Sequence, residues 1–543
     1  MKTDLEITQT IVGKDINLLA NELGIKENEL LAYGKEMAKV DLSLLKRLEH
    51  EKDGKLILVT AITPTPAGEG KTTMSIGLSD GLKRIGKNVI TALREPSLGP
   101  VLGMKGGATG GGYAQIIPRE KINLHFTGDL HAISTAHNFL SAAIDNHIFY
   151  DNELNIDPTR VVWPRTLDMN DRNIRNIQTD LRPDNFIITA ASEVMAILAL
   201  ASSLENLRER LGNILIAYDK AGNEIYADKL NVTDSLVILL KEAIKPNLVQ
   251  TLEGTPVFVH GGPFANIAHG CNSLLATKMA LKLGDYVVTE AGFGADLGAE
   301  KFIDVKTRFL GKNPDAAVLV ATLRALKYHG FEDEGKSGLE ALKDGLVNIE
   351  RHASNMKKYG IPYVIAMNHF INDPEEEVEY FINWAKKEGH PVSFVDSFAE
   401  GSKGAVDFAE KVVKLVEEKN NFKTIYNLED DLYQKVKKIA TTIYGATTVK
   451  YSEEAKEKLD LLNKNYHDLP VVIAKTPLSF SNRAKLRGTV YEFDLVISDA
   501  RVSRGAGFVV VLTKGIITMP GLPKVPNAEK MFITNEGVIK GRL

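Results

Sequence analysis

Cysteine is nearly absent from this sequence, since Cys271 is the only one among 543 residues. One cysteine excludes an intrachain disulfide and every metal site built from a cysteine cluster, and it fits a reducing compartment. The first residues lack the apolar core of a secretory signal, and no apolar run is long enough to cross a bilayer. We therefore expect a cytoplasmic protein without a membrane partner.

An excess of charge of one sign is also missing, because 66 Lys and Arg residues stand against 70 Asp and Glu residues. Duplex-binding proteins normally carry a strong basic excess or a basic stripe, so no nucleic-acid partner is expected. The hydrophobic content of 44% is ordinary for a globular protein, and the length exceeds what one hydrophobic core usually supports. The chain should therefore fold as several domains.

One stretch around residue 60 predicts a buried strand followed directly by a turn and a helix. Leu56 to Ile62 form an unbroken apolar run, as in a strand that is covered on both faces within a parallel sheet. After a glycine-containing turn, apolar residues recur at helical spacing. These residues are Met74, Leu78, Leu82 and Ile85. A turn that joins a strand to a helix N-terminus is the usual setting of a phosphate-binding loop.

The turn itself carries a Gly-Lys-Thr signal for polyphosphate binding. Backbone N–H groups of residues 67–72 can surround a phosphate, Lys71 can reach its terminal groups, and the Thr72 hydroxyl can bind Mg²⁺. The consensus begins with glycine, and Thr65 stands at that position here. The alternative is an ordinary tight turn before a helix. The expected nucleotide contacts are Thr65, Pro66, Ala67, Gly68, Glu69, Gly70, Lys71 and Thr72.

A second strand, Asn88 to Leu93, ends in Arg94 and Glu95. Ligands of parallel sheets collect beyond the carboxyl ends of the strands, so we expect both side chains to face the same crevice as Lys71. The planar guanidinium of Arg94 can bind a carboxylate or a phosphate through two hydrogen bonds. A structural salt bridge with a neighbouring acid is the alternative.

Residues 103–112 contain six glycines, which predicts backbone with positive φ or in close approach to a ligand rather than a flexible linker. Four histidines follow within residues 125–147. No two of them have the i, i+4 spacing that places two imidazoles on one helical face, so packing or substrate contact is favoured over a metal site.

Alternating strands and helices predict the fold class: a phosphate-loop α/β protein with a mostly parallel sheet covered by helices on both faces. Further strands of this sheet are expected at 256–260, 285–290, 316–322, 363–367 and 392–395. Helices are expected before residue 50, and one long helix over 192–212. Smaller domains should include a C-terminal α+β domain with strands at 470–475, 491–497 and 507–512, the last two antiparallel. The predicted domains are 1–160 with 300–415, 161–299, and 416–543.

A loop after the strand ending at Glu290 contains Gly292, Gly294 and Gly298. Its third glycine lies one position too late for a dinucleotide-binding fingerprint, so a nicotinamide oxidoreductase is a weak alternative. Glu290 and Asp296 could hold a cation near the phosphates, or they could be exposed loop carboxylates.

Five strings together resemble the formate–tetrahydrofolate ligase family over essentially the whole chain. They are residues 63–73 (TPTPAGEGKTT), 93–99 (LREPSLG), 103–113 (GMKGGATGGGY), 320–330 (VATLRALKYHG) and 519–523 (MPGLP). The resemblance implies ATP-dependent ligation of formate to tetrahydrofolate through formyl phosphate. It also implies Mg²⁺, a monovalent cation such as K⁺ or NH₄⁺, and a homotetramer.

For the site, the resemblance implies Lys71 and Arg94 as catalytic residues and an aromatic sandwich of the folate ring by Phe370 and Phe398. Glu95, Tyr113 and Gln115 are the candidate polar contacts. The family often has tryptophan where Phe398 stands and alanine where Thr109 stands, and no general base is apparent. A regulatory or partitioning phosphate-loop ATPase remains the main alternative, although such proteins usually have a lysine early in the loop, where this chain has Thr65 and Pro66.

Overall fold

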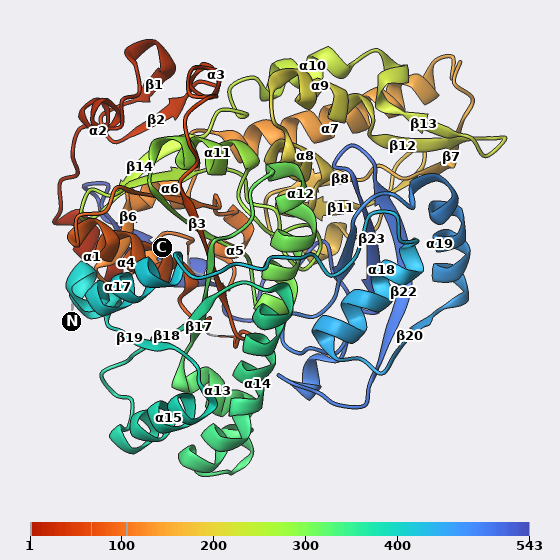
Figure 1. Ribbon diagram of the computed structural model, residues 1–543. Coiled ribbons are helices and arrows are strands. Elements are labelled where there is room, and N and C mark those ends of the chain that lie inside the picture. Colours follow the sequence, from red (N-terminus) through yellow and green to blue (C-terminus); the bar gives the residue numbers. More distant parts are fainter. Residues whose placement is uncertain (1–2, 67, 105–106, 542) are drawn as a thin grey trace.

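One large mixed sheet forms the centre of the computed structural model, which describes residues 3–66, 68–104, 107–541 and 543 (Figure 1). The sheet has twelve strands. Its main path runs β1 (Leu30–Tyr33), β2 (Met37–Val40), β14 (Asn247–Thr251), β15 (Pro256–Val259), β4 (Val89–Leu93), β16 (Tyr286–Glu290), β3 (Lys55–Ala61), β17 (Ala316–Ala321), β18 (Tyr363–Asn368) and β19 (Val392–Val395). Off this path, β6 (Ala114–Ile117) pairs with β14 and with β5 (Gly110–Gly111).

From β15 to β19 every neighbouring pair of strands is parallel. The pairs between β1, β2, β14 and β15 are antiparallel. The mostly parallel sheet that the sequence predicts is therefore confirmed. Strand β3, which precedes the predicted phosphate loop, lies between β16 and β17, and its apolar residues are buried because both faces of the sheet are covered.

Helices pack on both faces of the parallel part of the sheet. Ile57 and Val59 of β3 share a core with α4 (Lys71–Arg84) and α17 (Val406–Leu415). Leu56 and Leu58 point to the opposite face, where they join the core formed with α11 (Leu274–Leu283) and α14 (Gly338–Tyr359). This alternation is what a strand with a two-residue side-chain period must show between two helical layers.

Two expected helical regions differ in the structure. Before residue 50 the chain forms not only helices but also the hairpin β1–β2, which extends the large sheet through β14. The long helix expected over 192–212 is two helices, α8 (Glu193–Leu200) and α9 (Leu204–Gly212). The Ser203 side chain accepts a hydrogen bond from the Asn206 N–H and so begins a new helix.

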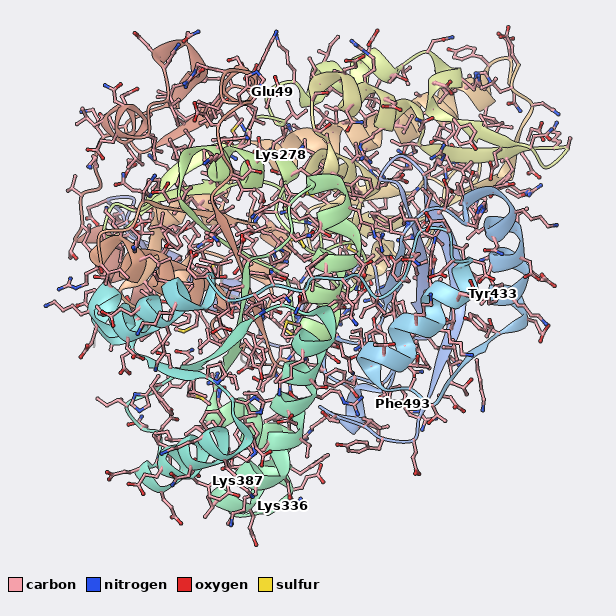
Figure 2. The ribbon with its side chains drawn as sticks, in the orientation of Figure 1. Glu49, Lys278, Lys336, Lys387, Tyr433 and Phe493 are labelled. Atoms are coloured by element: carbon pink, nitrogen blue, oxygen red, sulfur yellow. The ribbon has the colours of Figure 1, made fainter. Side chains whose placement is uncertain are left out.

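The C-terminal part contains a four-stranded sheet in the order β20 (Thr448–Tyr451), β22 (Asp494–Ser503), β23 (Phe508–Thr513) and β21 (Val471–Ala474), drawn in blue in Figure 1. Strands β22 and β23 are antiparallel, as predicted. Helices α18 (Leu432–Ile439) and α19 (Glu453–Tyr466) accompany this sheet, and Figure 2 labels Tyr433, which belongs to α18.

The remaining elements are short or lie outside the two main sheets. A three-stranded sheet has the order β13 (Glu224–Tyr226), β12 (Leu215–Asp219) and β7 (Ile156–Val161). The other α-helices are α1 (Asp4–Gln9), α2 (Ile16–Glu22), α3 (Ser43–Arg47), α5 (Leu98–Leu102), α6 (Arg119–Asn123), α7 (Asp129–Phe149), α10 (Thr233–Leu240), α12 (Thr307–Leu310), α13 (Leu323–His329), α15 (Glu375–Glu388) and α16 (Ser397–Glu400). Strands β14 to β16 lie within the predicted second domain, residues 161–299, but belong to the large sheet. The division into three domains stays a prediction.

Within the described residues, no helix combines the length and apolar character needed to span a membrane.

Candidate active site

Three neighbouring strands end at the edge of the sheet where the candidate site lies. Strand β16 lies between β3 and β4 and ends in Glu290. Lys71 is the first residue of α4, after the turn that follows β3, and Arg94 comes directly after β4. Parallel strands place their carboxyl ends at one edge, so the fold itself brings these side chains together.

The predicted phosphate loop, residues 65–72 and called the phosphate loop below, has the backbone conformation that its glycines allow. Gly68 and Gly70 have φ values of +79° and +74°. A Cβ added to Gly70 would lie 2.7 Å from the Nδ2 atom of Asn368, and this amide donates a hydrogen bond of 3.3 Å to the Glu69 carbonyl. Glycine at position 70 is therefore required both by φ and by the close approach of β18. Ala67 lies outside the described residues.

Glu69 holds the phosphate loop to the following strand–helix unit. Its buried carboxylate accepts hydrogen bonds of 2.8 Å from the Thr65 N–H and 2.7 Å from the hydroxyl of Thr322, the N-cap residue of α13. Pro66 is exposed on the loop. The contacts of Glu69 thus fix the shape of the loop.

Glu290 contacts both halves of the candidate site. Its Oε2 atom accepts a hydrogen bond of 2.9 Å from the Thr72 hydroxyl, and its Oε1 atom lies 3.7 Å from Arg94 Nη2. Burial lowers the pKa of the Lys71 ammonium group, the charge of Glu290 opposes this effect, and the charge of Arg94 adds to it. Lys71, Thr72, Arg94 and Glu290 therefore form one electrostatic cluster.

Arg94 keeps hydrogen-bonding capacity in this cluster. Its side chain is 22% exposed, and its ion pair with Glu290 is longer than a hydrogen bond. Its Nε atom is buried and has no hydrogen-bond partner among the residues that the structure describes. A Cβ added to Gly292 would lie 2.7 Å from Arg94 Nη1, so the loop after β16 packs closely on the guanidinium. The acidic neighbour expected for Arg94 is therefore Glu290, and the binding of an oxyanion by Arg94 stays a prediction.

The carboxylates of Glu290 and Asp296 are buried, so the expectation that they are exposed loop residues is wrong. Asp296 forms an ion pair of 2.7 Å with Lys475, and both side chains have 0% exposure. Asp296 thus binds a lysine from the C-terminal part of the chain. Glu290 is the carboxylate that faces the phosphate loop.

The glycine-rich loop packs tightly against the segment that contains Phe398. Gly110 and Gly112 have φ values of +78° and +58°, and a Cβ on Gly112 would lie 2.0 Å from the Phe398 carbonyl oxygen. The same carbonyl accepts a hydrogen bond of 2.9 Å from the Tyr113 N–H. Close approach, rather than flexibility, explains these glycines. Thr109 does not adopt a positive φ, so its side chain causes no backbone strain.

The two aromatic residues implied for the folate ring follow adjacent strands. Phe370 lies just after β18 and Phe398 lies in α16 after β19, and both are partly buried. The Arg324 guanidinium is 5.5 Å from the Phe370 ring centroid, and its Nη2 atom donates a hydrogen bond of 3.0 Å to the Gly68 carbonyl. Sequence reasoning missed Arg324, although it stands within the string 320–330 that carries the family resemblance.

The three candidate polar contacts have different surroundings. Tyr113 is exposed. Gln115 is buried, and its Nε2 atom donates to the carbonyls of Asp4 and Gly112 at 2.9 and 2.6 Å. Glu95 is buried, and burial together with the charge of Asp129 raises the pKa of its carboxyl group well above the usual value. Their contact with a folate stays a prediction.

The histidines of residues 125–147 serve packing where they are buried. The His137 ring stacks on Trp163 with a centroid distance of 4.1 Å, and burial lowers the pKa of His137 to about 3. The His147 Nε2 atom accepts a hydrogen bond from the Leu154 N–H.

In the part of the chain that the structure describes, no group of three or more His, Cys, Asp or Glu residues could hold a metal ion. The oxygen atoms of Thr72 and Glu290 do suit Mg²⁺, which usually takes few protein ligands beside substrate phosphates.

Comparisons with known proteins identify the family of this chain. The family model described as formate–tetrahydrofolate ligase matches residues 2–543. A protein of Petrotoga mobilis named formate–tetrahydrofolate ligase is 52% identical, and the alignment covers 100% of this chain and 100% of that protein. The likeness therefore extends over the large sheet, the phosphate loop and the C-terminal part alike. The chain belongs to the formate–tetrahydrofolate ligase family and is an enzyme of the ligase class.

Proposed function

We propose that this chain joins formate to tetrahydrofolate at the expense of ATP and releases 10-formyltetrahydrofolate, ADP and phosphate. The observation that carries the proposal is the contact of Glu290 with both Thr72 and Arg94. It brings a phosphate loop and an arginine suited to a carboxylate to one point of the sheet edge. The printed name of the Petrotoga mobilis relative supports these substrates.

In the first step, an oxygen of formate attacks the γ-phosphorus of ATP, and the bond to the β–γ bridging oxygen breaks. The products are formyl phosphate and ADP. Arg94 would hold the formate carboxylate through two donors of its guanidinium, and Lys71 would neutralise charge that develops on the transferred phosphoryl group. Backbone N–H groups of residues 68–72 would position the phosphates at the N-terminus of α4.

Mg²⁺, when bound, supplies positive charge to the terminal phosphates. The residues present fit this ion, since the Thr72 hydroxyl lies at the start of α4 beside a buried carboxylate. Thr72 would be a direct ligand, and the nucleotide would supply further oxygen ligands.

In the second step, the N10 amine of tetrahydrofolate attacks the formyl carbon, and phosphate leaves with the electrons of the C–O bond. Phe370 and Phe398 would hold the pterin ring between their aromatic faces. Tyr113, Gln115 and Glu95 are the polar groups that we propose for its orientation.

We further propose a homotetramer, activation by a monovalent cation such as K⁺ or NH₄⁺, and a cytoplasmic location. These three properties rest on the family resemblance of the sequence. They are tested by the molecular mass in solution, by the dependence of turnover on K⁺ and NH₄⁺, and by cell fractionation.

The decisive experiment measures 10-formyltetrahydrofolate in the presence of ATP, formate and tetrahydrofolate, with one substrate left out in turn. Product that requires all three substrates supports the ligase. ADP release that continues without formate and tetrahydrofolate would instead indicate a regulatory ATPase. Fluorescence titration with a nicotinamide dinucleotide tests the weaker alternative, and we expect no binding.

A further inference from the structure

Glu290 is fixed in place by the sheet rather than by a flexible loop. It is the last residue of β16, its backbone is in register with Val59 of β3, and the next N–H, that of Ala291, donates to the Val59 carbonyl at 3.1 Å. Its side chain is 2% exposed. A carboxylate held this rigidly can determine the positions of the groups that contact it.

Each carboxylate oxygen of Glu290 faces a different half of the site. Oε2 accepts the proton of the Thr72 hydroxyl, and Oε1 faces the Arg94 guanidinium. A hydroxyl has one proton and two lone pairs, so a Thr72 that donates to Glu290 must present its lone pairs elsewhere. Those lone pairs are the ones that a metal ion on a nucleotide would need.

We propose that Glu290 is a positioning residue that couples Mg²⁺–nucleotide binding at Thr72 to formate binding at Arg94. The proposal rests on the proposed function, because formate and Mg²⁺–ATP are its substrates. A cation bound by the Thr72 oxygen strengthens the hydrogen bond from its hydroxyl to Oε2. The better-held carboxylate then orients Arg94, so each ligand raises the affinity of the other by the same factor.

The geometry distinguishes this role from simple charge compensation. Lys71 and Arg94 are cations, and any anion nearby would reduce their repulsion. Coupling additionally requires one group with two acceptor atoms, one for each partner. Glu290→Gln replaces one carboxylate oxygen with an NH₂ group, which donates and so cannot accept from whichever of Thr72 and Arg94 it faces. Glu290→Asp keeps the negative charge but is shorter by one methylene.

The experiment uses calorimetry on the purified full chain with ADP and formate, without turnover. For the unsubstituted protein, we expect Mg²⁺ to tighten ADP binding, and Mg²⁺–ADP to tighten formate binding by about tenfold, a typical coupling. In Glu290→Gln, ADP binding with EDTA should change less than about twofold, while the effect of Mg²⁺ on ADP and of Mg²⁺–ADP on formate should be lost. Retention of both effects would overturn the proposal.

Glu290→Asp separates the two explanations. If charge alone matters, this variant should retain the coupling, and the proposal is then wrong. If two simultaneous contacts matter, the shorter side chain should lose most of the coupling although it keeps the charge.

Asp80→Asn is the matched control, because Asp80 is another buried carboxylate that accepts hydroxyl hydrogen bonds. It lies on α4, away from the sheet edge, and accepts bonds from Thr251 and Thr255 at 2.6 and 2.5 Å. In Asp80→Asn, the effect of Mg²⁺ on ADP binding and the effect of Mg²⁺–ADP on formate binding should equal those of the unsubstituted protein. Equal loss in Glu290→Gln and Asp80→Asn would assign the effect to general destabilisation and overturn the proposal.

Two further results keep the test decisive. If Glu290→Gln does not fold, Thr72→Val removes the other end of the contact, and it should abolish both Mg²⁺ effects. A Thr72→Val protein in which Mg²⁺–ADP still tightens formate binding would contradict the coupling. The Mg²⁺ effect on ADP binding needs no formate, so it can succeed or fail independently of the proposed ligation.

Discussion

Two opposing effects act on the pKa of the Lys71 ammonium group, since burial disfavours its charge and the carboxylate of Glu290 favours it. We expect Lys71→Ala to lower turnover by roughly three orders of magnitude, the upper range for loss of one charge-stabilising donor. The midpoint of thermal unfolding should change little, because Lys71 is the first residue of α4 and is only partly buried. Near-normal ligation rates in this variant would remove Lys71 from the mechanism.

The same balance predicts a change in pH dependence. The charged groups that act on Lys71 are Glu290 at the end of β16, Arg94 after β4, and Glu69 in the phosphate loop. Glu290→Gln removes a charge that raises the pKa of Lys71, so that pKa should fall and the ammonium proton should be lost at lower pH. The alkaline limb of kcat/KM against pH should therefore move to lower pH, and an unmoved limb would contradict this assignment.

Arg94 has donors left for a substrate, and its removal should affect formate selectively. We expect Arg94→Ser to raise the KM for formate by about tenfold or more, as for loss of a charge-assisted hydrogen bond, and to leave the KM for ATP within about threefold. Steady-state kinetics with each substrate varied in turn measures both values. Arg84→Ser, at the opposite end of α4, is the control and should leave both KM values unchanged.

At the scale of elements, the glycine-rich loop depends on its contact with the chain around Phe398. Gly112 has a φ of +58°, and Gly112→Ala would place a Cβ 2.0 Å from the Phe398 carbonyl oxygen. Either the glycine-rich loop or the chain at Phe398 must therefore move. We expect a several-fold rise in the KM for tetrahydrofolate with little change for ATP.

Gly335→Ala is a suitable control for this prediction. Gly335 also has a positive φ, +99°, but no atom lies within 4 Å of an added Cβ. It should therefore show only the backbone cost of about 1–2 kcal/mol in the free energy of unfolding. If both variants have the same KM for tetrahydrofolate, the loop contact does not serve the folate site.

The sequence predicts those elements whose signals are local. The apolar run of β3 and the helical spacing of Met74, Leu78 and Leu82 lie within thirty residues of each other, and both elements are confirmed. The break between α8 and α9 was missed because the capping bond of Ser203 competes with a continuous apolar pattern. The sequence suggests Glu290 near the phosphates only as one alternative, and its contacts with Thr72 and Arg94 could not be derived because they depend on β16 lying between β3 and β4.

At the scale of the whole molecule, the C-terminal part reaches the large sheet through a buried ion pair. Lys475, just after β21, pairs with Asp296 in the segment that follows β16, and it also donates to the Ser479 carbonyl at 2.6 Å. Removal of one partner leaves a buried charge without compensation. The pair therefore ties the stability of the C-terminal sheet to that of the catalytic edge.

Lys475→Met should reduce the free energy of unfolding by about 3–5 kcal/mol, as for other broken buried pairs. The double variant Asp296→Asn with Lys475→Met should recover part of this loss, because no charge is left uncompensated. Urea unfolding measures these differences. Lys458→Met breaks two more exposed ion pairs, with Glu454 and Asp499, and should cost less than about 1 kcal/mol. If Lys475→Met also lowers the free energy of unfolding by less than about 1 kcal/mol, the buried pair does not stabilise the fold.

The strand order has a consequence for how the chain folds during synthesis. Strands β3 and β4 are synthesised before residue 100 is reached, yet β16, which lies between them in the sheet, is completed only at residue 290. A nascent chain of two hundred residues therefore has both flanking strands and lacks the one that belongs between them. Nucleotide affinity should arise late and abruptly during translation, when this strand inserts and brings its acidic end to the phosphate loop.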